Sequence, residues 1–230
     1  MKLAGWNFVD ENASILWRSY HFTKDAQATT LVFRGTDGLV VVSPATGLES
    51  RDYDALKEVG EVRALIANNS FHHMGQADWR KRFPNAESYC PPGSIERLAK
   101  KAPGIPFKSL SELKLPPTVH WEDPPGFKTG EALLSVKGSN GYVWFTGDLL
   151  TNIEKAPGVF GMMMKWLDAA PGFKLFKPGV WMFVKDKKVV REWTLDRLTK
   201  EPPTVVVTAH GPPVDSADVA ELAKKQLERL

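Results

Sequence analysis

The chain has 230 residues, of which 43% are hydrophobic and 25% are charged. That is enough apolar sequence to bury one sizeable core, so we expect a single domain spanning residues 1–230. The formal net charge of +3 is spread along the chain, which argues against nucleic-acid binding, because that function usually requires a clustered basic face.

The start of the chain and its cysteine content suggest where the protein works. Residues 1–7 lack the apolar core of a secretory signal peptide. The single cysteine, Cys90, excludes an intrachain disulfide and is typical of a reducing compartment. We therefore expect a cytoplasmic protein.

The first half of the chain alternates between predicted strands and predicted helices. Three apolar segments separated by short turns indicate an N-terminal antiparallel meander. After the meander, segments with helical spacing alternate with short apolar runs. Strands are predicted over residues 15–22, 28–34, 39–42, 62–67 and 86–89, and helices over residues 51–59, around Trp79 and over residues 95–101.

The second half begins with residues 116–130, which are rich in proline and glycine and are expected to form a loop. Residues 131–136 and 142–145 then form a predicted hairpin around Asn140-Gly141, a strong hairpin signal. Charged residues, glycines and prolines interrupt the apolar residues 156–184. We therefore predict no membrane span and no membrane contact.

The C-terminal part returns to regular structure. A helix is predicted over residues 189–198 and a buried strand over residues 204–208. The closing amphipathic helix is expected to be capped at Asp215 or Ser216 and to run through Leu227. Strands come first, then strands and helices alternate, and then the order repeats, which favours two sheets with helices outside.

Three polar sites follow directly after apolar strands. They are His72-His73, Asp148 and His210, in a chain with only five histidines. Loops at strand ends can hold ligands rigidly on a sheet, and three imidazole nitrogens with one carboxylate oxygen suit zinc or another first-row ion. His72 and His73 can reach one ion only if the chain turns between them, because neighbouring residues on a helix or strand point in different directions.

These residues resemble the signature motifs of the metallo-β-lactamase superfamily, and the resemblance covers most of the chain. The family pattern H-x-H-x-D-H-x-G corresponds to residues 68–75, in which His73 and Gly75 match. Thr146-Gly147-Asp148 matches the family's Gly-Asp strand end, and Ala209-His210-Gly211 matches its last motif. The resemblance implies an α/β protein, an αββα sandwich of two mixed sheets with helices outside.

The departures from the family pattern fall on one half of its ligand set. Asn68 and Ser70 stand where the first two histidines belong, and Phe127 stands at the histidine of the Pro-Gly loop. His72 stands in place of the family's aspartate. The resemblance therefore implies one lost metal position and one that survives for a single ion. The ligands of the surviving position would be His72, His73, Asp148 and His210.

Such a site implies a metal-dependent hydrolase that cleaves an ester, a thioester or another activated acyl or phosphoryl bond in a small-molecule substrate. The cofactor would be one divalent metal ion, zinc in the first place, with iron or manganese as alternatives. Asp148 and His72 would be the catalytic residues, with Asp148 accepting the proton of a water activated by the ion.

A second hypothesis keeps the fold without the metal. Because three family ligands are replaced, the chain could be an inactive relative with a degenerate active site, in which the imidazoles hydrogen-bond to Asp148 and the groove binds a small molecule or a protein partner. The sequence leaves the roles of two further features undecided. His120 is either a replacement ligand or a solvated loop residue, and Met162 to Trp166 either cap the groove or belong to the core.

Overall fold

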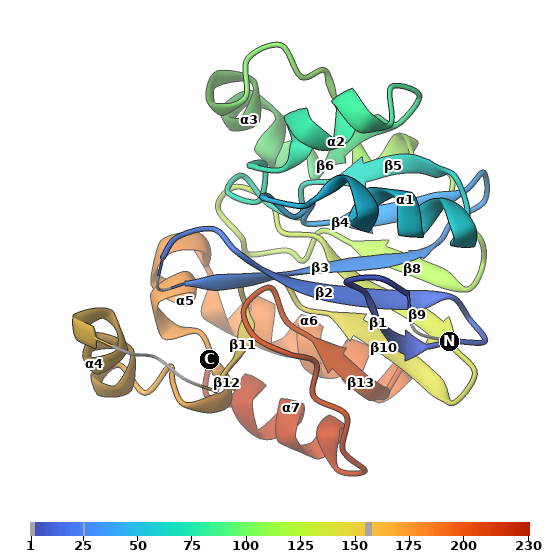
Figure 1. Ribbon diagram of the computed structural model, residues 1–230. Coiled ribbons are helices and arrows are strands. Elements are labelled where there is room, and N and C mark those ends of the chain that lie inside the picture. The colour runs from blue at the N-terminus through green and yellow to red at the C-terminus, as the bar shows by residue number, and fades with distance from the viewer. Residues whose placement is uncertain (1–2, 25, 155–157) are drawn as a thin grey trace.

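The computed structural model describes residues 3–24, 26–154 and 158–230. Within these residues, no helix is both long enough and apolar enough to cross a bilayer. Most strands belong to two large sheets that enclose a shared apolar core, and helices cover the outer surface of each sheet (Figure 1). The predicted αββα sandwich is therefore confirmed.

The first sheet has seven strands that lie in chain order. The first four pair antiparallel, which confirms the predicted meander, and the last four pair parallel. The strands are β1 (Asn7–Asp10), β2 (Ile15–His21), β3 (Gln27–Arg34), β4 (Leu39–Val42), β5 (Val62–Ile66), β6 (Glu87–Cys90) and β7 (Phe107–Ser109). β4 is buried at every position, as expected for a central strand covered on both faces.

The second sheet has the order β13-β10-β9-β8. Its strands are β8 (Val119–Glu122), β9 (Leu133–Gly138), β10 (Gly141–Phe145) and β13 (Pro203–Val207). β9 and β10 form the predicted hairpin, in which Gly141 follows the two-residue loop and has a φ of 133°, which favours glycine. β10 and β13 run parallel. A separate small sheet pairs β11 (Leu150–Ile153) with β12 (Gly172–Leu175).

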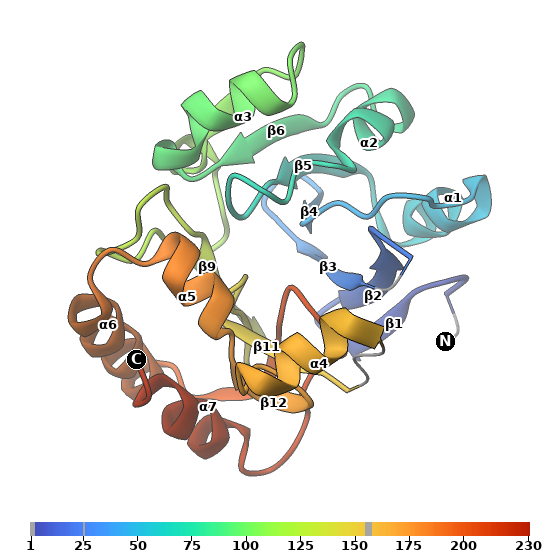
Figure 2. The ribbon, with the colours of Figure 1, turned by 90° about the vertical axis from the view of Figure 1, so that its left-hand side faces the viewer.

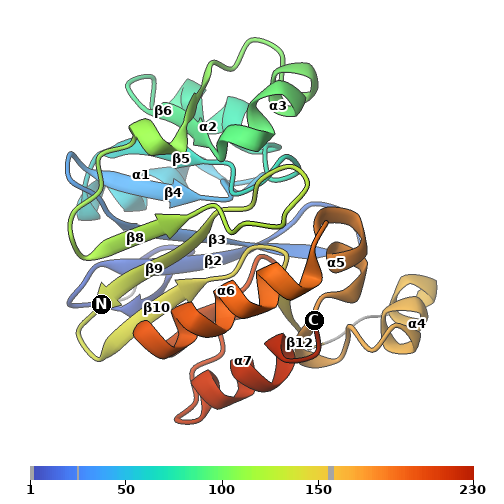
Figure 3. The ribbon, with the colours of Figure 1, turned by 180° about the vertical axis from the view of Figure 1, so that it is seen from behind.

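The helices lie in three groups. The first sheet is flanked by α1 (Ser50–Val59), α2 (Gln76–Arg82) and α3 (Ile95–Lys101), with short 3-10 turns η1 (Pro92–Ser94) and η2 (Leu110–Glu112). The second sheet is covered by α6 (Lys187–Lys200) and α7 (Val219–Leu227), as Figure 3 shows. At one end of the sandwich lie α4 (Gly158–Trp166) and α5 (Lys177–Phe183), which face the viewer in Figure 2.

Two sequence-based expectations are wrong. Residues 116–130 are not all loop, because β8 pairs with β9 as an edge strand. No proline lies within β8, so its backbone can pair with a neighbouring strand. The last helix is preceded by Asp218 and not by Asp215 or Ser216. The backbone of Val214 is bonded to β13, which keeps the chain extended at this point and delays the start of the helix.

Candidate metal centre

Three of the four proposed ligands meet where strands of the two sheets end. His72 lies in the turn after β5, Asp148 follows β10 and His210 follows β13. One ligand atom from each of these residues lies within 4.8 Å of the other two. Because β10 and β13 are parallel neighbours, their carboxyl ends bring Asp148 and His210 to the same edge of the sheet.

Asp148 is in the middle of this group. Its Oδ1 atom is 3.2 Å from His72 Nε2 and 3.1 Å from His210 Nε2. Burial alone would raise the pKa of Asp148, but the two imidazoles outweigh burial and hold that pKa well below its usual range. The carboxylate is therefore ionised at neutral pH, and a buried negative charge of this kind needs a cation beside it.

The ring of His210 is oriented by the backbone. Its Nδ1 atom is 2.8 Å from the carbonyl oxygen of Gln27, which can only accept a hydrogen bond, so Nδ1 carries a proton. In the neutral ring, Nε2 would then direct a lone pair at the Asp148 carboxylate. This contact becomes favourable with a second proton on His210 or with a metal ion between the two groups. Burial alone would lower the pKa of His210, but its hydrogen bond to Asp148 raises that pKa.

The spacing of the three groups fits a metal ion. Ligand atoms at about 2.0 to 2.2 Å from a tetrahedral zinc ion lie roughly 3.3 to 3.6 Å from one another. The separations of Asp148 Oδ1 from the two imidazole nitrogens, 3.2 and 3.1 Å, are close to this range. Two imidazole nitrogens and one carboxylate oxygen also suit zinc chemically. The residues present therefore fit a single first-row ion.

The structure does not bring His73 into this group, contrary to the sequence-based expectation. His72 and His73 lie in a hydrogen-bonded turn that leads directly into α2, and the amide of Gln76 donates to the carbonyl oxygen of His73. Neighbouring side chains in such a coiled backbone diverge, so only one of the two rings reaches Asp148. Burial lowers the pKa of His73, and within residues 3–24, 26–154 and 158–230 its buried Nδ1 atom has no hydrogen-bond partner.

Ser43 supports the second imidazole. Its Oγ atom is 2.7 Å from His72 Nδ1, at the end of β4. Ser43 is fully buried and has a φ of 53°, a left-handed conformation that residues other than glycine seldom adopt. A partner on the far nitrogen orients a ligand ring and selects its tautomer. Sequence reasoning missed this residue, because nothing in the run of valines before it indicates a polar contact.

We expect Ser43→Ala to lower zinc affinity by about tenfold, because loss of an outer partner of a ligating histidine typically costs 10- to 100-fold. A competition titration against a chromophoric chelator measures this affinity. Ser88→Ala is the matched control, because Ser88 is also a buried strand serine but bonds to Gln76. An equal loss of affinity in both variants would contradict a specific role for Ser43.

A buried network of amides connects Asp148 to a second carboxyl group, Glu131. The side-chain amide of Asn69 donates to Asp148 Oδ2 at 2.8 Å and to Glu131 Oε2 at 2.9 Å. Asn68 donates to the other oxygen of Glu131, at 2.8 Å. The amide of Asn68, which stands at the family's first histidine position, is thus bonded to a carboxyl group within the protein. Glu131 and Asn69 were not predicted, since neither forms a recognisable motif along the chain.

Glu131 differs from Asp148 in its ionisation. Burial and the nearby charge of Asp148 raise the pKa of Glu131 well above its usual value, although the two asparagine amides oppose this shift. Two carboxyl groups joined through one amide therefore have pKa values displaced in opposite directions. Asp148 thus favours its ionised form, and Glu131 is shifted towards its protonated form.

Gly75 allows the histidine turn to lie close to the strand end. A Cβ atom at this position would be 2.1 Å from the carbonyl oxygen of Pro44 and 2.6 Å from that of Ala45. These backbone atoms belong to the segment that follows Ser43. Gly75 is thus required by a close approach of two backbones.

We expect Gly75→Ala to lower the free energy of unfolding by about 1 to 3 kcal/mol, the usual cost of overpacking, and to weaken metal binding by moving the turn that holds His72. Chemical denaturation and metal titration measure the two effects. Gly104→Ala is the control for glycine loss, because no atom lies within 4 Å of a Cβ there, although its φ of 89° adds backbone strain. Unchanged metal binding in Gly75→Ala would contradict the coupling.

The other candidate residues lie elsewhere. His120 on β8 contacts Glu201 at 2.5 Å, so it belongs to a separate ion-pair cluster and is not a replacement ligand. Phe127 forms an isolated backbone bridge with Val184. The ring of His210 is flanked by Phe22 and Phe176, with ring centres 5.6 and 5.9 Å away. One side of the candidate centre is therefore aromatic.

Comparison with solved structures identifies the fold. TMB-1 aligns over 98% of both chains with a TM-score of 0.64 and 12% sequence identity. A metallo-β-lactamase from Erythrobacter litoralis aligns over 100% of this chain and 99% of its own, with a TM-score of 0.63 and 13% identity. FIM-1 from Pseudomonas aeruginosa, in its mono-zinc form, aligns over 97% and 94% with a TM-score of 0.59 and 11% identity.

This chain has the metallo-β-lactamase fold. The resemblance expected from the motifs is confirmed at the level of the fold, with matches over almost the whole chain. No protein-family model and no curated protein sequence matches the chain. The metallo-β-lactamase fold is therefore present with a sequence that has diverged far from these neighbours, and the site must be interpreted from its own residues.

Proposed function

We propose that the chain is a metal-dependent hydrolase with a mononuclear centre held by His72, Asp148 and His210. The observation that supports this most is the convergence of both Nε2 atoms on one buried carboxylate oxygen, at 3.2 and 3.1 Å. The fold supports it too, since FIM-1, a neighbour with this fold, is described in a mono-zinc form. Zinc is the first candidate, with iron and manganese as alternatives.

A single ion is favoured over two. Two of the three side chains that replace the family's other ligands are poorly suited to a second ion, since Asn68 donates its amide to Glu131 and Phe127 is apolar. Three protein ligands leave a fourth position open, which is typical of catalytic rather than structural zinc. When bound, the ion would act as a Lewis acid and lower the pKa of a bound water.

The residues of the chain then have separate roles. His72 and His210 would hold the ion, and their rings are oriented by Ser43 and by the Gln27 carbonyl. Asp148 would be the third residue to hold it, and its carboxylate could accept a proton from the attacking water. The aromatic rings beside His210 would limit the access of water to the reacting group. The substrate class is a small molecule with an ester, thioester or other activated acyl or phosphoryl bond.

The alternative is an inactive, metal-free domain that binds a small molecule or protein partner in the same place. One observation favours it: the carboxylate lies within ion-pair distance of both imidazoles, and the hydrogen bond to Asp148 raises the pKa of His210. A protonated His210 would supply the cation that Asp148 requires.

Elemental analysis of protein purified without chelator distinguishes the two proposals. We expect close to one zinc, iron or manganese ion per chain, a higher melting temperature on adding the metal to stripped protein, and metal-dependent hydrolysis of activated aryl ester, thioester or phosphodiester probes. Absence of bound metal together with an unchanged melting temperature would overturn the hydrolase proposal and leave the metal-free domain.

A further inference from the structure

The exposed large hydrophobic side chains of the described residues are confined to three segments of the chain. These segments are the histidine turn, α4 and α5. The side chains are Phe71, Met74, Met162, Met163, Trp166, Trp181 and Met182. We call this set the apolar rim. Trp166 is 84% exposed and Met162 is 66% exposed, so these are not core residues with a visible edge.

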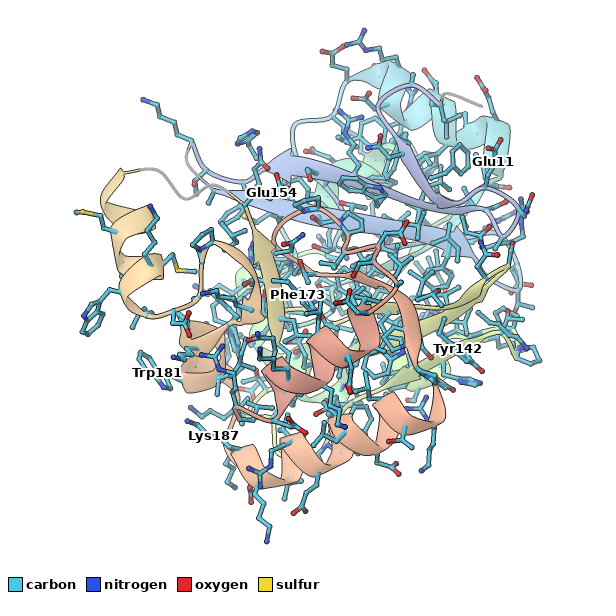
Figure 4. The ribbon with its side chains drawn as sticks, turned by 90° about the horizontal axis from the view of Figure 1, so that it is seen from below. Glu11, Tyr142, Glu154, Phe173, Trp181 and Lys187 are labelled. Atoms are coloured by element: carbon cyan, nitrogen blue, oxygen red, sulfur yellow. The ribbon has the colours of Figure 1, made fainter. Side chains whose placement is uncertain are left out.

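Part of the apolar rim lies beside the candidate centre. Phe71 packs edge-on against Phe183 of α5, with ring centres 5.0 Å apart, which ties the histidine turn to that helix. Helices α4 and α5 lie together on the face turned to the viewer in Figure 2. In Figure 4, α4 projects from the rest of the ribbon, and Trp181 lies at the periphery of the molecule. Phe71 and Met74 also bracket His72-His73 in the chain.

Helix α4 already has a packed inner side. Met164 is 1% exposed and lies in a cluster with Ala169 and Ala170, which joins the helix to the small β11-β12 sheet. Met162, Met163 and Trp166 of the same helix face solvent. Large apolar side chains that are gathered and exposed in this way often mark a binding surface.

The charge around the rim indicates what binds. Residues 158–188 contain six lysines and two aspartates, which gives this segment a formal charge of +4, more than the +3 of the whole chain. Asp168 is neutralised within the segment and beyond it, through ion pairs with Lys174, Lys177 and Arg229. The lysines would attract a surface with anionic groups on its outside, and the exposed methionines and tryptophan would enter an apolar layer beneath those groups.

We propose that the apolar rim and its lysines dock the protein on an anionic lipid surface. Tryptophan is enriched at the boundary between headgroups and acyl chains, and short amphipathic helices lie in that plane with lysine on the polar side. Each lysine near such a surface adds attraction to acidic headgroups. This inference departs from the sequence-based expectation of no membrane contact, since docking at the interface does not require a spanning helix.

Docking would bring His72 close to the lipid, because the rim residues Phe71 and Met74 flank it. A substrate with an acyl chain could then reach the candidate centre from the membrane. The docking itself does not depend on the proposed hydrolase activity, and its test can be made with metal-free protein.

The test uses sedimentation of the full chain with vesicles of phosphatidylcholine alone or of phosphatidylcholine with 30% phosphatidylglycerol, both with and without chelator. We expect binding to the anionic vesicles that falls as salt rises, and little binding to the neutral ones. The double variant Trp166→Ser/Trp181→Ser should lower the partition coefficient at least about tenfold, because both exposed indoles are lost. Quenching of tryptophan fluorescence by brominated acyl chains should be lost with it.

Matched charge variants complete the experiment. Lys185→Glu should lower binding at least about fivefold, whereas Lys225→Glu on α7 should leave it within about twofold. Equal loss in both would show nonspecific attraction and overturn the proposal. No binding to anionic vesicles would overturn it as well. So would a stable dimer of the parent protein that Trp166→Ser/Trp181→Ser dissociates, since the rim would then belong to a second copy of the chain.

Discussion

Replacing His210 with alanine should lower zinc affinity by more than about 100-fold. His210 supplies an imidazole nitrogen directly to the proposed ion, and loss of a mere outer partner already costs 10- to 100-fold. The same substitution in His72 should have a similar effect, because both Nε2 atoms contact the same carboxylate oxygen. Titration of metal-stripped protein against a competing chelator measures the affinity, and elemental analysis of the purified variants measures occupancy.

The adjacent histidine provides the control. His73 is next to His72 in the chain but lies outside the ligand group, so His73→Ala should keep zinc affinity within about threefold of the parent. This comparison separates the three-ligand centre from the four-ligand centre that the motif implies. A loss in His73→Ala as large as that in His210→Ala would mean that the turn rearranges when metal binds and that His73 joins the shell.

Much of the fold follows from local sequence. The meander, the parallel strands after it and the β9-β10 hairpin are marked by period-two or continuous apolar runs with glycine turns, and these signals act over a few residues. The two wrong predictions, a loop over all of residues 116–130 and an earlier cap for the last helix, have a different cause. β8 is an edge strand whose pairing depends on β9, and α7 begins late because Val214 is bonded to β13. Neither partner is visible from the segment itself.

The site also combines features that local sequence predicts with features that depend on distant partners. Position after a strand was enough to suggest Asp148 and His210, because strand ends converge in any sheet with this topology. Which ring of His72-His73 faces Asp148 depends on the turn between them. Glu131 is more than 60 residues from Asn69 in the chain, and its burial is known only once the sheets have packed. A metal ion bound to these residues remains a prediction.

Glu131 should make stability depend on pH. Its pKa is raised in the folded state, so the folded protein binds its proton more tightly than the unfolded chain does. The resulting contribution is fully present below the unfolded pKa near 4.5 and is lost as pH rises through the raised value. The metal-free protein should therefore lose stability from this residue between pH 5 and pH 8.

Two substitutions test this. Glu131→Gln is neutral at every pH, and rotation of the Asn68 amide would present Oδ1, which now lacks a partner, to the new donor. We expect Glu131→Gln to gain stability relative to the parent as pH rises from 5 to 8. Glu131→Ala leaves the Asn68 and Asn69 amides unpaired in a cavity and should cost about 2 to 4 kcal/mol.

Denaturant unfolding with chelator at pH 5, 6.5 and 8 gives these values. His210 also loses its contribution as pH rises, because its pKa is raised above the ordinary value, but this effect is shared by the parent and Glu131→Gln and cancels in their difference. A difference that stays constant from pH 5 to pH 8 would show that Glu131 ionises normally. The buried amides would then stabilise a charged carboxylate, and two negative charges joined by one amide would increase the attraction of the centre for a metal ion.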